Sequence, residues 1–341
     1  MHFAIIGAGM AGLACADALN AAGHSTELFD KGREAGGRMS TRRMASPLGQ
    51  VAIDHGAQYF TARDPAFRRV VGGWHAGGVI TPWPDISAEA WVGVPGMNAI
   101  IAHMAACHAV NWGVQITGMA RSDWQWWLSS KGGARGPFDA AVLAIPAEQS
   151  AGLLSLHDFA MARIALMARS QPCWTSLFVF DSPLAGVPPV IRDANHIAWA
   201  VRNNAKPGRS GPEAWVVQAN ADWSGARLEL TPHDISPQLQ LALAQVAGCA
   251  LPEPVASMSH RWRFALSAGT GHGALWNREI GLGVCGDWLL GPRIECAWLS
   301  GNLLAAHATG GSAAIDHEAI LLAPAQPGTF PKDHMDSGNV A

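Results

Sequence analysis

The first strand and the glycine-rich turn after it constrain the fold of this chain more than any other stretch. The apolar residues 3–6 are typical of a buried parallel strand. They lead into Gly7-Ala8-Gly9-Met10-Ala11-Gly12 and a helix predicted over residues 10–22. A second strand, residues 26–29, ends on Asp30. This order of strand, glycine turn, helix, strand and acid predicts a parallel α/β unit that binds a dinucleotide.

Each glycine of the turn has a physical role in that interpretation. Gly7 allows the tight turn, Gly9 lets the backbone approach a pyrophosphate, and Gly12 lets the helix and strand pack closely. The first N–H groups of the helix are then free to bind phosphate, and the Asp30 carboxylate accepts from a ribose hydroxyl. A glycine-rich unit of the same shape without a ligand is the alternative.

The residues after Asp30 favour FAD over NAD as the dinucleotide. Asp30-Lys31 is followed by Gly36-Gly37-Arg38-Met39, which resembles the flavin-binding signature of the amine oxidases, phytoene desaturases and renalases. In that family the arginine, here Arg38, lies along the pyrophosphate, where a guanidinium pairs with phosphate oxygens. The alternative for Arg38 is a surface side chain in a flexible loop.

A second nucleotide-facing motif lies near the other end of the chain. The apolar strand 282–284 runs into Gly286-Asp287, and a helix follows from about Glu295. A carboxylate at the end of a parallel strand suits the ribityl or ribose hydroxyls, and the N-terminus of the following helix suits the flavin pyrimidine. A simple NAD dehydrogenase does not need this second motif, whereas the alternative is an ordinary turn.

Between these motifs, Gly56-Ala57 provides small residues that let backbone lie against a flat ring. Gln58 and Tyr59 follow directly and are candidates for contact with flavin or substrate, or Tyr59 is a core residue. By the same resemblance, the backbone near Ile116 meets the adenine.

The pattern of elements predicts an α/β fold of two parts. The first is a Rossmann-like FAD-binding domain of the p-hydroxybenzoate hydroxylase and amine oxidase topology, over residues 1–76, 95–150 and 280–312. Residues 77–94 and 151–279 are predicted to form an α+β substrate domain on a mostly antiparallel sheet, with residues 313–341 as a flexible tail. Within these parts we expect a turn at residues 131–136 and a helix capped by Ser236, with Pro237 at its first position and Gly248 past its end.

Composition excludes several classes of function. Charged residues make up 14% of the 341 residues, the net charge is −3, and no basic stretch suggests nucleic-acid binding. The six cysteines show no metal-binding spacing and are expected to be reduced thiols, so no metal site is predicted. No segment is apolar and long enough to span a membrane, and the first strand leaves no room for a leader peptide. We therefore expect a cytoplasmic protein, either monomer or homodimer.

Several segments together narrow the resemblance to bacterial renalase-like proteins, over residues 1 to about 310. They are His55-Gly56-Ala57-Gln58-Tyr59-Phe60-Thr61, Trp91-Val92-Gly93-Val94-Pro95-Gly96-Met97, Lys206-Pro207-Gly208-Arg209, His260-Arg261-Trp262 and Cys285-Gly286-Asp287-Trp288. The resemblance implies an enzyme that oxidises the 2- and 6-dihydro isomers of NAD(P) to NAD(P)⁺ and passes the electrons to O₂, giving H₂O₂.

An amine oxidase or desaturase of the wider superfamily, acting on another small reduced substrate, is a competing interpretation. Such enzymes use a lysine near the flavin and an aromatic cage for the amine. The lysines here are 31, 131, 206 and 332, and none lies in the strand expected at 255–264, where that lysine belongs. With a single tyrosine a two-tyrosine cage cannot form, although Trp262 and Trp288 are possible substitutes. No cysteine occupies the flavin-attachment position, so FAD is expected to be non-covalent.

A dihydropyridine needs only stacking against the flavin, because its ring nitrogen expels the hydride without a general base. No catalytic side chain is assigned, and His55 and His260 are predicted to be structural residues, with contact to substrate as the alternative. A flavoprotein that binds without turnover is a third hypothesis. The predicted cofactor-binding residues are Gly7, Gly9, Met10, Ala11, Gly12, Asp30, Lys31, Gly37, Arg38, Met39, Gly56, Ala57, Gln58, Ile116, Gly286, Asp287, Ile294 and Ala297. The predicted substrate pocket comprises Gln58, Tyr59, Trp262 and Trp288.

Overall fold

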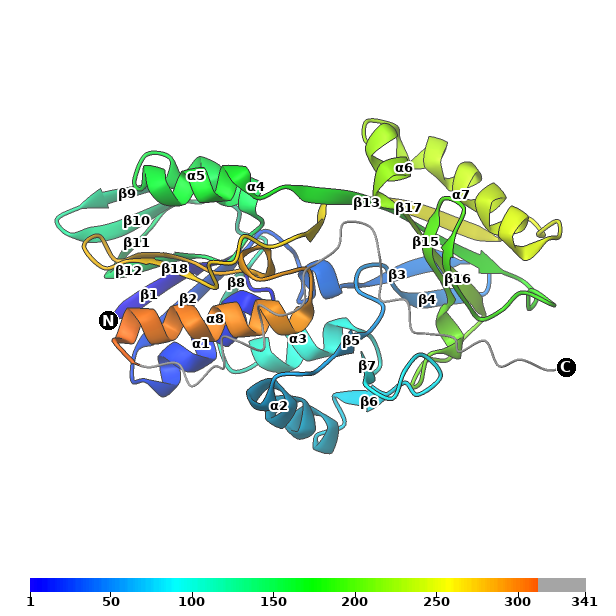
Figure 1. The fold of residues 1–341 in the computed structure, drawn as a ribbon, viewed down its shortest axis with the longest axis horizontal. Coiled ribbons are helices and arrows are strands. Elements are labelled where there is room, and N and C mark those ends of the chain that lie inside the picture. Colours follow the sequence, from blue (N-terminus) through cyan, green and yellow to red (C-terminus); the bar gives the residue numbers. More distant parts are fainter. Residues whose placement is uncertain (312–341) are drawn as a thin grey trace, which may run out of the picture.

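The computed structural model describes residues 1–311 as two sheet-based lobes joined by long strands (Figure 1). The first lobe is built on a six-stranded sheet in the order β18-β19-β12-β1-β2-β8. Its strands are β1 (His2–Ile6), β2 (Ser25–Asp30), β8 (Ala109–Trp112), β12 (Ala140–Leu143), β18 (Leu275–Asn277) and β19 (Leu282–Val284). All neighbouring pairs are parallel except β18 with β19.

Strand β1 is a continuous apolar run in the sequence because both faces of the sheet are buried at this strand. Phe3 and Ile5 point into one hydrophobic cluster, and Ala4 and Ile6 point into another on the opposite face. The first face is covered by the helices α1 (Met10–Ala21), α3 (Asn98–Ala105) and α8 (Ile294–Thr309). The second is covered by β9 (Ile116–Ser122), β10 (Gln125–Ser130) and β11 (Gly133–Phe138), with α4 (Ala147–Leu154) and α5 (Phe159–Met167).

The second lobe is an antiparallel sheet in the order β14-β15-β16-β13-β17. Its strands are β13 (Ser170–Phe180), β14 (Val190–Ala194), β15 (Ile197–Arg202), β16 (Glu213–Ala219) and β17 (Ala256–Ser267). Helices α6 (Ala221–Ala226) and α7 (Pro232–Ala247) cover one face. Residues of the other face, among them Leu177, Trp199 and Val216, join the same hydrophobic cluster as Phe3 of the first lobe. The two lobes therefore share a core.

Short elements complete the seam between the lobes. They are the hairpin β3 (Thr41–Ser46) and β4 (Gly49–Asp54), the small sheet of β5 (Phe60–Thr61), β6 (Ile80–Pro82) and β7 (Ala90–Gly93), helix α2 (Pro65–Ala76), and the 3₁₀ turns η1 (Gly37–Met39), η2 (Asn203–Ala205) and η3 (Asp287–Leu289). Residues 77–94, assigned to the substrate domain from sequence, pair here with β5, which was assigned to the FAD-binding domain.

The predicted α/β class with a second antiparallel sheet is confirmed, and two local predictions are wrong. Helix α7 begins at Pro232 rather than Pro237, because Thr231 and Asp234 form a reciprocal capping box five residues earlier than expected, leaving Pro237 inside the helix. Residues 133–136, predicted as turn, belong to β11. The predicted tail at 313–341 lies outside the described residues. Within residues 1–311, no helix combines the length and apolar character that crossing a bilayer requires.

Candidate cofactor-binding and active site

The carboxyl ends of four parallel strands meet at one edge of the six-stranded sheet. Ile6 of β1, Asp30 of β2, Leu143 of β12 and Val284 of β19 end there, each followed by a loop. Strand β1 lies between β2 and β12, so the chain leaves the sheet toward opposite sides around it. Such a switch point is where open α/β sheets bind their ligands.

The glycine turn after β1 fits a pyrophosphate. A Cβ added at Gly12 would lie 2.0 Å from the carbonyl oxygen of Gly7, so Gly12 is required by helix–strand packing. A Cβ added at Gly9 would meet no heavy atom within 4 Å, so open space lies over this residue. Helix α1 has no side-chain cap and no acidic residue in its first turn. The N–H groups of Met10 and Ala11 are thus available to an anion.

The Asp30 carboxylate supports this turn from the neighbouring strand. Its Oδ2 accepts from the Ala8 backbone N–H at 2.8 Å, and its Oδ1 accepts from the Gly32 N–H at 2.7 Å. Each carboxylate oxygen can accept more than one hydrogen bond, so the group can also bind ribose hydroxyls.

The loop after Asp30 also contacts the segment predicted to meet adenine. The Val114 N–H donates to the Asp30 carbonyl at 2.8 Å, which brings Ile116 at the start of β9 toward the loop. Ile116 is buried in the cluster of the second sheet face. Lys31 is exposed and donates to Gln149 Oε1 of α4 at 3.2 Å.

Arg38 and Asp287 join the two ends of the chain directly. The guanidinium donates to both carboxylate oxygens, at 2.7 Å and 2.5 Å, between residues 249 apart in sequence. The Asp287 side chain is 8% exposed and that of Arg38 is 37% exposed. Because a guanidinium has five N–H donors, this pair leaves donors for a phosphate. Gly37 and Met39 flank Arg38 in η1, with Met39 buried.

Gly56 and Ala57 lie against the backbone of Arg38. The Ala57 N–H donates to the Arg38 carbonyl at 2.8 Å, and a Cβ at Gly56 would lie 2.1 Å from the same oxygen. The need for glycine at 56 therefore arises from protein backbone, a reason that sequence analysis did not anticipate. Two predicted cofactor segments are thereby held together.

Helix α8 brings its N-terminus to the same edge. The Gly286 N–H donates to Ser300 Oγ at 2.9 Å, which ties the Gly286-Asp287 segment to the helix. Ile294 is the first residue of α8 and Ala297 lies one turn further, with no side-chain cap on the helix. The first-turn Glu295 is buried and accepts from the backbone N–H groups of Arg63 and Asp64, both at 2.6 Å.

An aromatic cluster lies where β17 meets the residues 55–57. Trp262 donates its indole N–H to the His55 carbonyl at 2.9 Å, and the His260 ring centroid lies 4.4 Å from Trp262 and 5.1 Å from His55. Burial, with the neighbouring His260, lowers the pKa of His55 to about 4. His55 is therefore a neutral imidazole at neutral pH.

Tyr59 pairs with an aromatic residue of the second lobe that sequence analysis missed. Its ring centroid lies 5.4 Å from that of Trp199 on β15, and the Arg192 guanidinium lies 4.9 Å from the Trp199 ring. The structure treats Trp288 differently. Trp288 is 1% exposed, packs in the cluster on the α4 side of the sheet and donates to the Ile145 carbonyl at 3.2 Å. This packing makes Trp288 a core residue, which differs from the pocket-lining role predicted for it.

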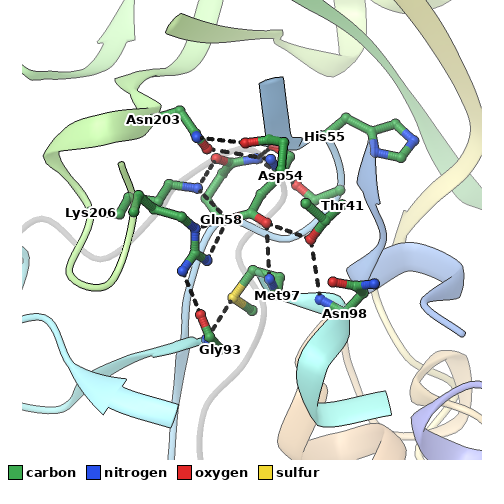
Figure 2. Close-up of polar contacts among 12 residues, drawn as sticks. Thr41, Asp54, His55, Gln58, Gly93, Met97, Asn98, Asn203 and Lys206 are labelled. Carbon is green, nitrogen blue, oxygen red and sulfur yellow. Dashed lines mark hydrogen bonds and ion pairs between the residues drawn. The ribbon is translucent and has the colours of Figure 1, made fainter. Parts of the chain in front are cut away.

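Gln58 also differs from its predicted pocket role, because its amide is turned into the protein (Figure 2). Nε2 donates to the carbonyls of Asp54 and Gly56 at 2.8 and 2.9 Å, and Oε1 accepts from Lys206 Nζ at 2.7 Å. The side chain is buried. All polar atoms of Gln58 are thus bonded within the chain.

The partners of Gln58 form a buried charge cluster that sequence analysis did not find. Asp54 Oδ2 accepts from Lys206 Nζ at 3.1 Å and from Arg209 at 2.7 Å, while Oδ1 accepts from Thr41 and from the Met97 N–H. The side chains of Asp54 and Lys206 are fully buried. Burial opposes ionisation, but Lys206 and Arg209 hold the pKa of Asp54 well below its usual range. Burial lowers the pKa of Lys206 to about 8, partly offset by Asp54.

A hollow of about 680 Å³ lies elsewhere, at the start of α5 and along β18. Asp158, Trp276 and Asn277 are among its lining residues. None of the predicted cofactor-binding residues borders it, so it is separate from the candidate site.

Comparisons with known proteins concern the first lobe and the overall fold. Residues 5–74 match the family model of an NAD(P)-binding Rossmann-like domain. The fold is similar to that of a protein assigned as a protoporphyrinogen oxidase from Exiguobacterium sp. 255-15, with a TM-score of 0.72, 12% identity, and coverage of 90% of this chain and 98% of the other. Wild-type putrescine oxidase bound to putrescine has a TM-score of 0.68, 12% identity, and coverage of 91% and 99%.

Cyclohexylamine oxidase from Brevibacterium oxydans IH-35A is a further structural relative, with a TM-score of 0.66, 12% identity, and coverage of 91% and 98%. These matches extend over both lobes. The chain therefore contains a Rossmann-like dinucleotide-binding domain within the fold that these oxidases share.

Proposed function

We propose that this protein is an FAD-dependent oxidoreductase that binds FAD without a covalent bond. The observation that carries the proposal is the convergence of the glycine turn, Asp30, Arg38 and Asp287 at one strand edge. Beyond its pyrophosphate FAD carries a ribityl chain and an isoalloxazine ring, and the second motif at Asp287 extends the site to hold these groups. The similarity of fold to oxidases supports the same class.

The proposed roles of the binding residues follow from their chemistry. The uncapped N-terminus of α1 and the space over Gly9 bind the pyrophosphate, with Arg38 as its cationic partner. Asp30 accepts from the adenosine ribose, and Asp287 accepts from the ribityl chain. The uncapped N-terminus of α8 favours negative charge on the pyrimidine ring.

For the substrate, we propose the 2- and 6-dihydro isomers of NAD(P). Bound FAD would supply the hydride acceptor, so that NAD(P)⁺ forms. The two electrons would then reduce O₂ to H₂O₂. The residues of the seam bind and orient the dihydropyridine and exclude water. Among the described lysines, only Lys206 is buried. Its ammonium group donates to Asp54 and Gln58, so it does not take the role of the lysine near the flavin in amine oxidases. Neutral His55 avoids repulsion in a site where a pyridinium cation forms.

Amine oxidation is the second candidate function. Two structural relatives are named putrescine oxidase and cyclohexylamine oxidase. In this second proposal Tyr59, whose ring lies 5.4 Å from that of the buried Trp199 at an interplanar angle of 35°, is the aromatic side chain that contacts an amine or ammonium group.

An anaerobic titration of the flavin-loaded protein distinguishes the two candidates. Borohydride-reduced NAD⁺, which contains the 2-, 4- and 6-dihydro isomers, is added to one sample, pure 4-dihydro-NADH to a second, and primary amines to a third. We expect the isomer mixture alone to bleach the flavin absorbance rapidly. Bleaching by an amine alone would replace the dihydronicotinamide proposal with amine oxidation, and a protein that retains no flavin would refute both.

A further inference from the structure

The second lobe contacts residues 52–58 of the first lobe through a set of buried and partly buried hydrogen bonds. Asn203 of η2 accepts from the Asp54 N–H at 3.3 Å and donates to the Ala52 carbonyl at 3.1 Å (Figure 2). Gln218 of β16 donates to the Gly56 carbonyl at 2.8 Å. Lys206 adds bonds to Asp54 and Gln58.

Of these contacting side chains, Lys206 is the one whose burial is hardest to explain by its contribution to stability. Burying an ammonium group is costly, and a hydrophobic side chain of the same size often contributes as much stability as a buried ion pair. Asp54 already has a second cation, because Arg209 donates to the same oxygen at 2.7 Å and is 3% exposed. The cluster therefore holds one carboxylate against two cations, and neutrality does not require Lys206.

What Lys206 alone provides is the bond to Gln58. With Oε1 occupied by the ammonium, the Gln58 amide nitrogen is held toward the carbonyls of Asp54 and Gly56. The next residue, Ala57, is bonded to the Arg38 carbonyl, and Arg38 is bonded to Asp287. Hydrogen bonds joined through the Gly56–Ala57 backbone and through Arg38 itself thus link Lys206 to the two charged side chains at the strand edge.

We propose that Lys206 is a positioning residue of the cofactor site, which acts through Gln58 to hold the backbone of residues 54–57, and hence Arg38, in the geometry that binds FAD. This inference rests on the proposed FAD binding and assigns Gln58 a role inside the protein rather than against substrate. Lys206 belongs to the second lobe, so the binding site of the first lobe is completed by a side chain from its neighbour.

The test compares FAD dissociation constants of apo-protein variants, measured by quenching of FAD fluorescence, together with the visible spectrum of the bound flavin. K206M and Q58M are each expected to raise the dissociation constant at least about tenfold, as for loss of one hydrogen bond to a charged group. Since both changes break the same link, the double variant is expected to bind FAD no more than about twofold more weakly than the weaker single variant.

Two control variants separate positioning from general stability. K131M changes an exposed lysine in the turn between β10 and β11, and we expect wild-type binding. L239A removes a buried side chain of α7 in the cluster of the second lobe, so it lowers stability without touching the series of bonds. We expect L239A to leave the dissociation constant and the flavin spectrum unchanged, whereas K206M alters both.

Several results would overturn the inference. They are wild-type affinity and spectrum in K206M, an effect of L239A on FAD binding as large as that of K206M, or effects of K206M and Q58M that multiply in the double variant. If K206M does not fold, Q58M decides, because it keeps the pair of Lys206 and Asp54, and wild-type FAD binding by Q58M refutes the role. A wild-type protein that binds no FAD refutes the proposed function itself. If instead the wild type binds FAD and the variants bind it equally well, only the role of Lys206 is refuted.

Discussion

Substituting Gly9 by alanine is expected to separate cofactor binding from folding. Gly9 has φ −84° and ψ −172°, an extended conformation open to alanine, and the added Cβ meets no atom within 4 Å. Alanine is a poorer N-cap than glycine by about 0.5–1 kcal/mol. It also lowers the entropy of the unfolded chain, which returns about 0.4–1 kcal/mol. The free energy of unfolding of the apo-protein should therefore change by less than about 1 kcal/mol.

The same methyl group is expected to weaken FAD binding strongly. It fills the space over the turn where the pyrophosphate approaches the backbone, so the contacts to the α1 N-terminus lengthen or are lost. A loss of one charge-assisted hydrogen bond corresponds to about 1.5–3 kcal/mol. We therefore expect the FAD dissociation constant of G9A to rise between about tenfold and a hundredfold.

Two other glycines provide the comparison. In G12A the Cβ would lie 2.0 Å from the Gly7 carbonyl oxygen, so the apo-protein should lose about 1–3 kcal/mol of stability through overpacking. In G152A the Cβ enters open space on helix α4, and stability should be equal or higher by up to about 1 kcal/mol, with unchanged FAD affinity.

Urea unfolding of the apo-proteins and FAD fluorescence titration measure the two quantities separately. Wild-type FAD affinity in G9A would refute the assignment of this turn to the pyrophosphate. A stability loss in G9A equal to that of G12A would show that the space over Gly9 is not open.

Three further changes test other parts of the structure. Asp287→Ala removes the carboxylate paired with Arg38 and is expected to raise the FAD dissociation constant at least about tenfold, so a variant that purifies fully yellow would count against the ribityl role. The pKa of His55 is about 4 in the folded protein and near 6.5 in the unfolded chain, so between these pH values the unfolded chain binds one more proton and the free energy of unfolding should fall as the pH drops from 6.5 to 4. In H55Q this fall, measured by urea unfolding, should be smaller by on the order of 3 kcal/mol. The same pH dependence in H55Q as in wild type would contradict the burial argument. Gly301→Ala places a Cβ 2.2 Å from the Ala11 carbonyl oxygen, so α1 and α8 must separate; we expect a loss of about 1–3 kcal/mol by urea unfolding together with weaker FAD binding, and stability equal to wild type would exclude that close contact.

The part of the site that could be predicted from sequence is the part that local rules determine. The roles of Gly7 and Gly12 follow from the spacing of strand, turn and helix, and the structure shows Gly12 packed against the carbonyl oxygen of Gly7. Asp30 follows from its place at the end of a strand. These features depend on fewer than thirty consecutive residues, within which periodicity and backbone sterics are sufficient.

The orientations of Trp288 and Gln58 depend on contacts distant in the chain, which no local pattern predicts. Trp288 directly follows a predicted ligand, but its direction is set by packing against Ile145 and helix α4. Gln58 is turned inward by Lys206, which lies 148 residues away. A lysine before Pro207-Gly208 is typical of an exposed turn. No local pattern indicates that this lysine pairs with the Asp54 carboxylate of the other lobe.

The late position of β19 and α8 in the chain has a consequence for how the proposed FAD site forms during synthesis. The strand-edge site begins with residues 2–12, but Asp287 and the α8 N-terminus are the last parts of this site to leave the ribosome. Until then, the edge of β12 that pairs with β19 is unpaired, and Arg38 lacks its carboxylate partner. If FAD binds as proposed, its binding free energy therefore stabilises the fold only after the chain through α8 has been synthesised.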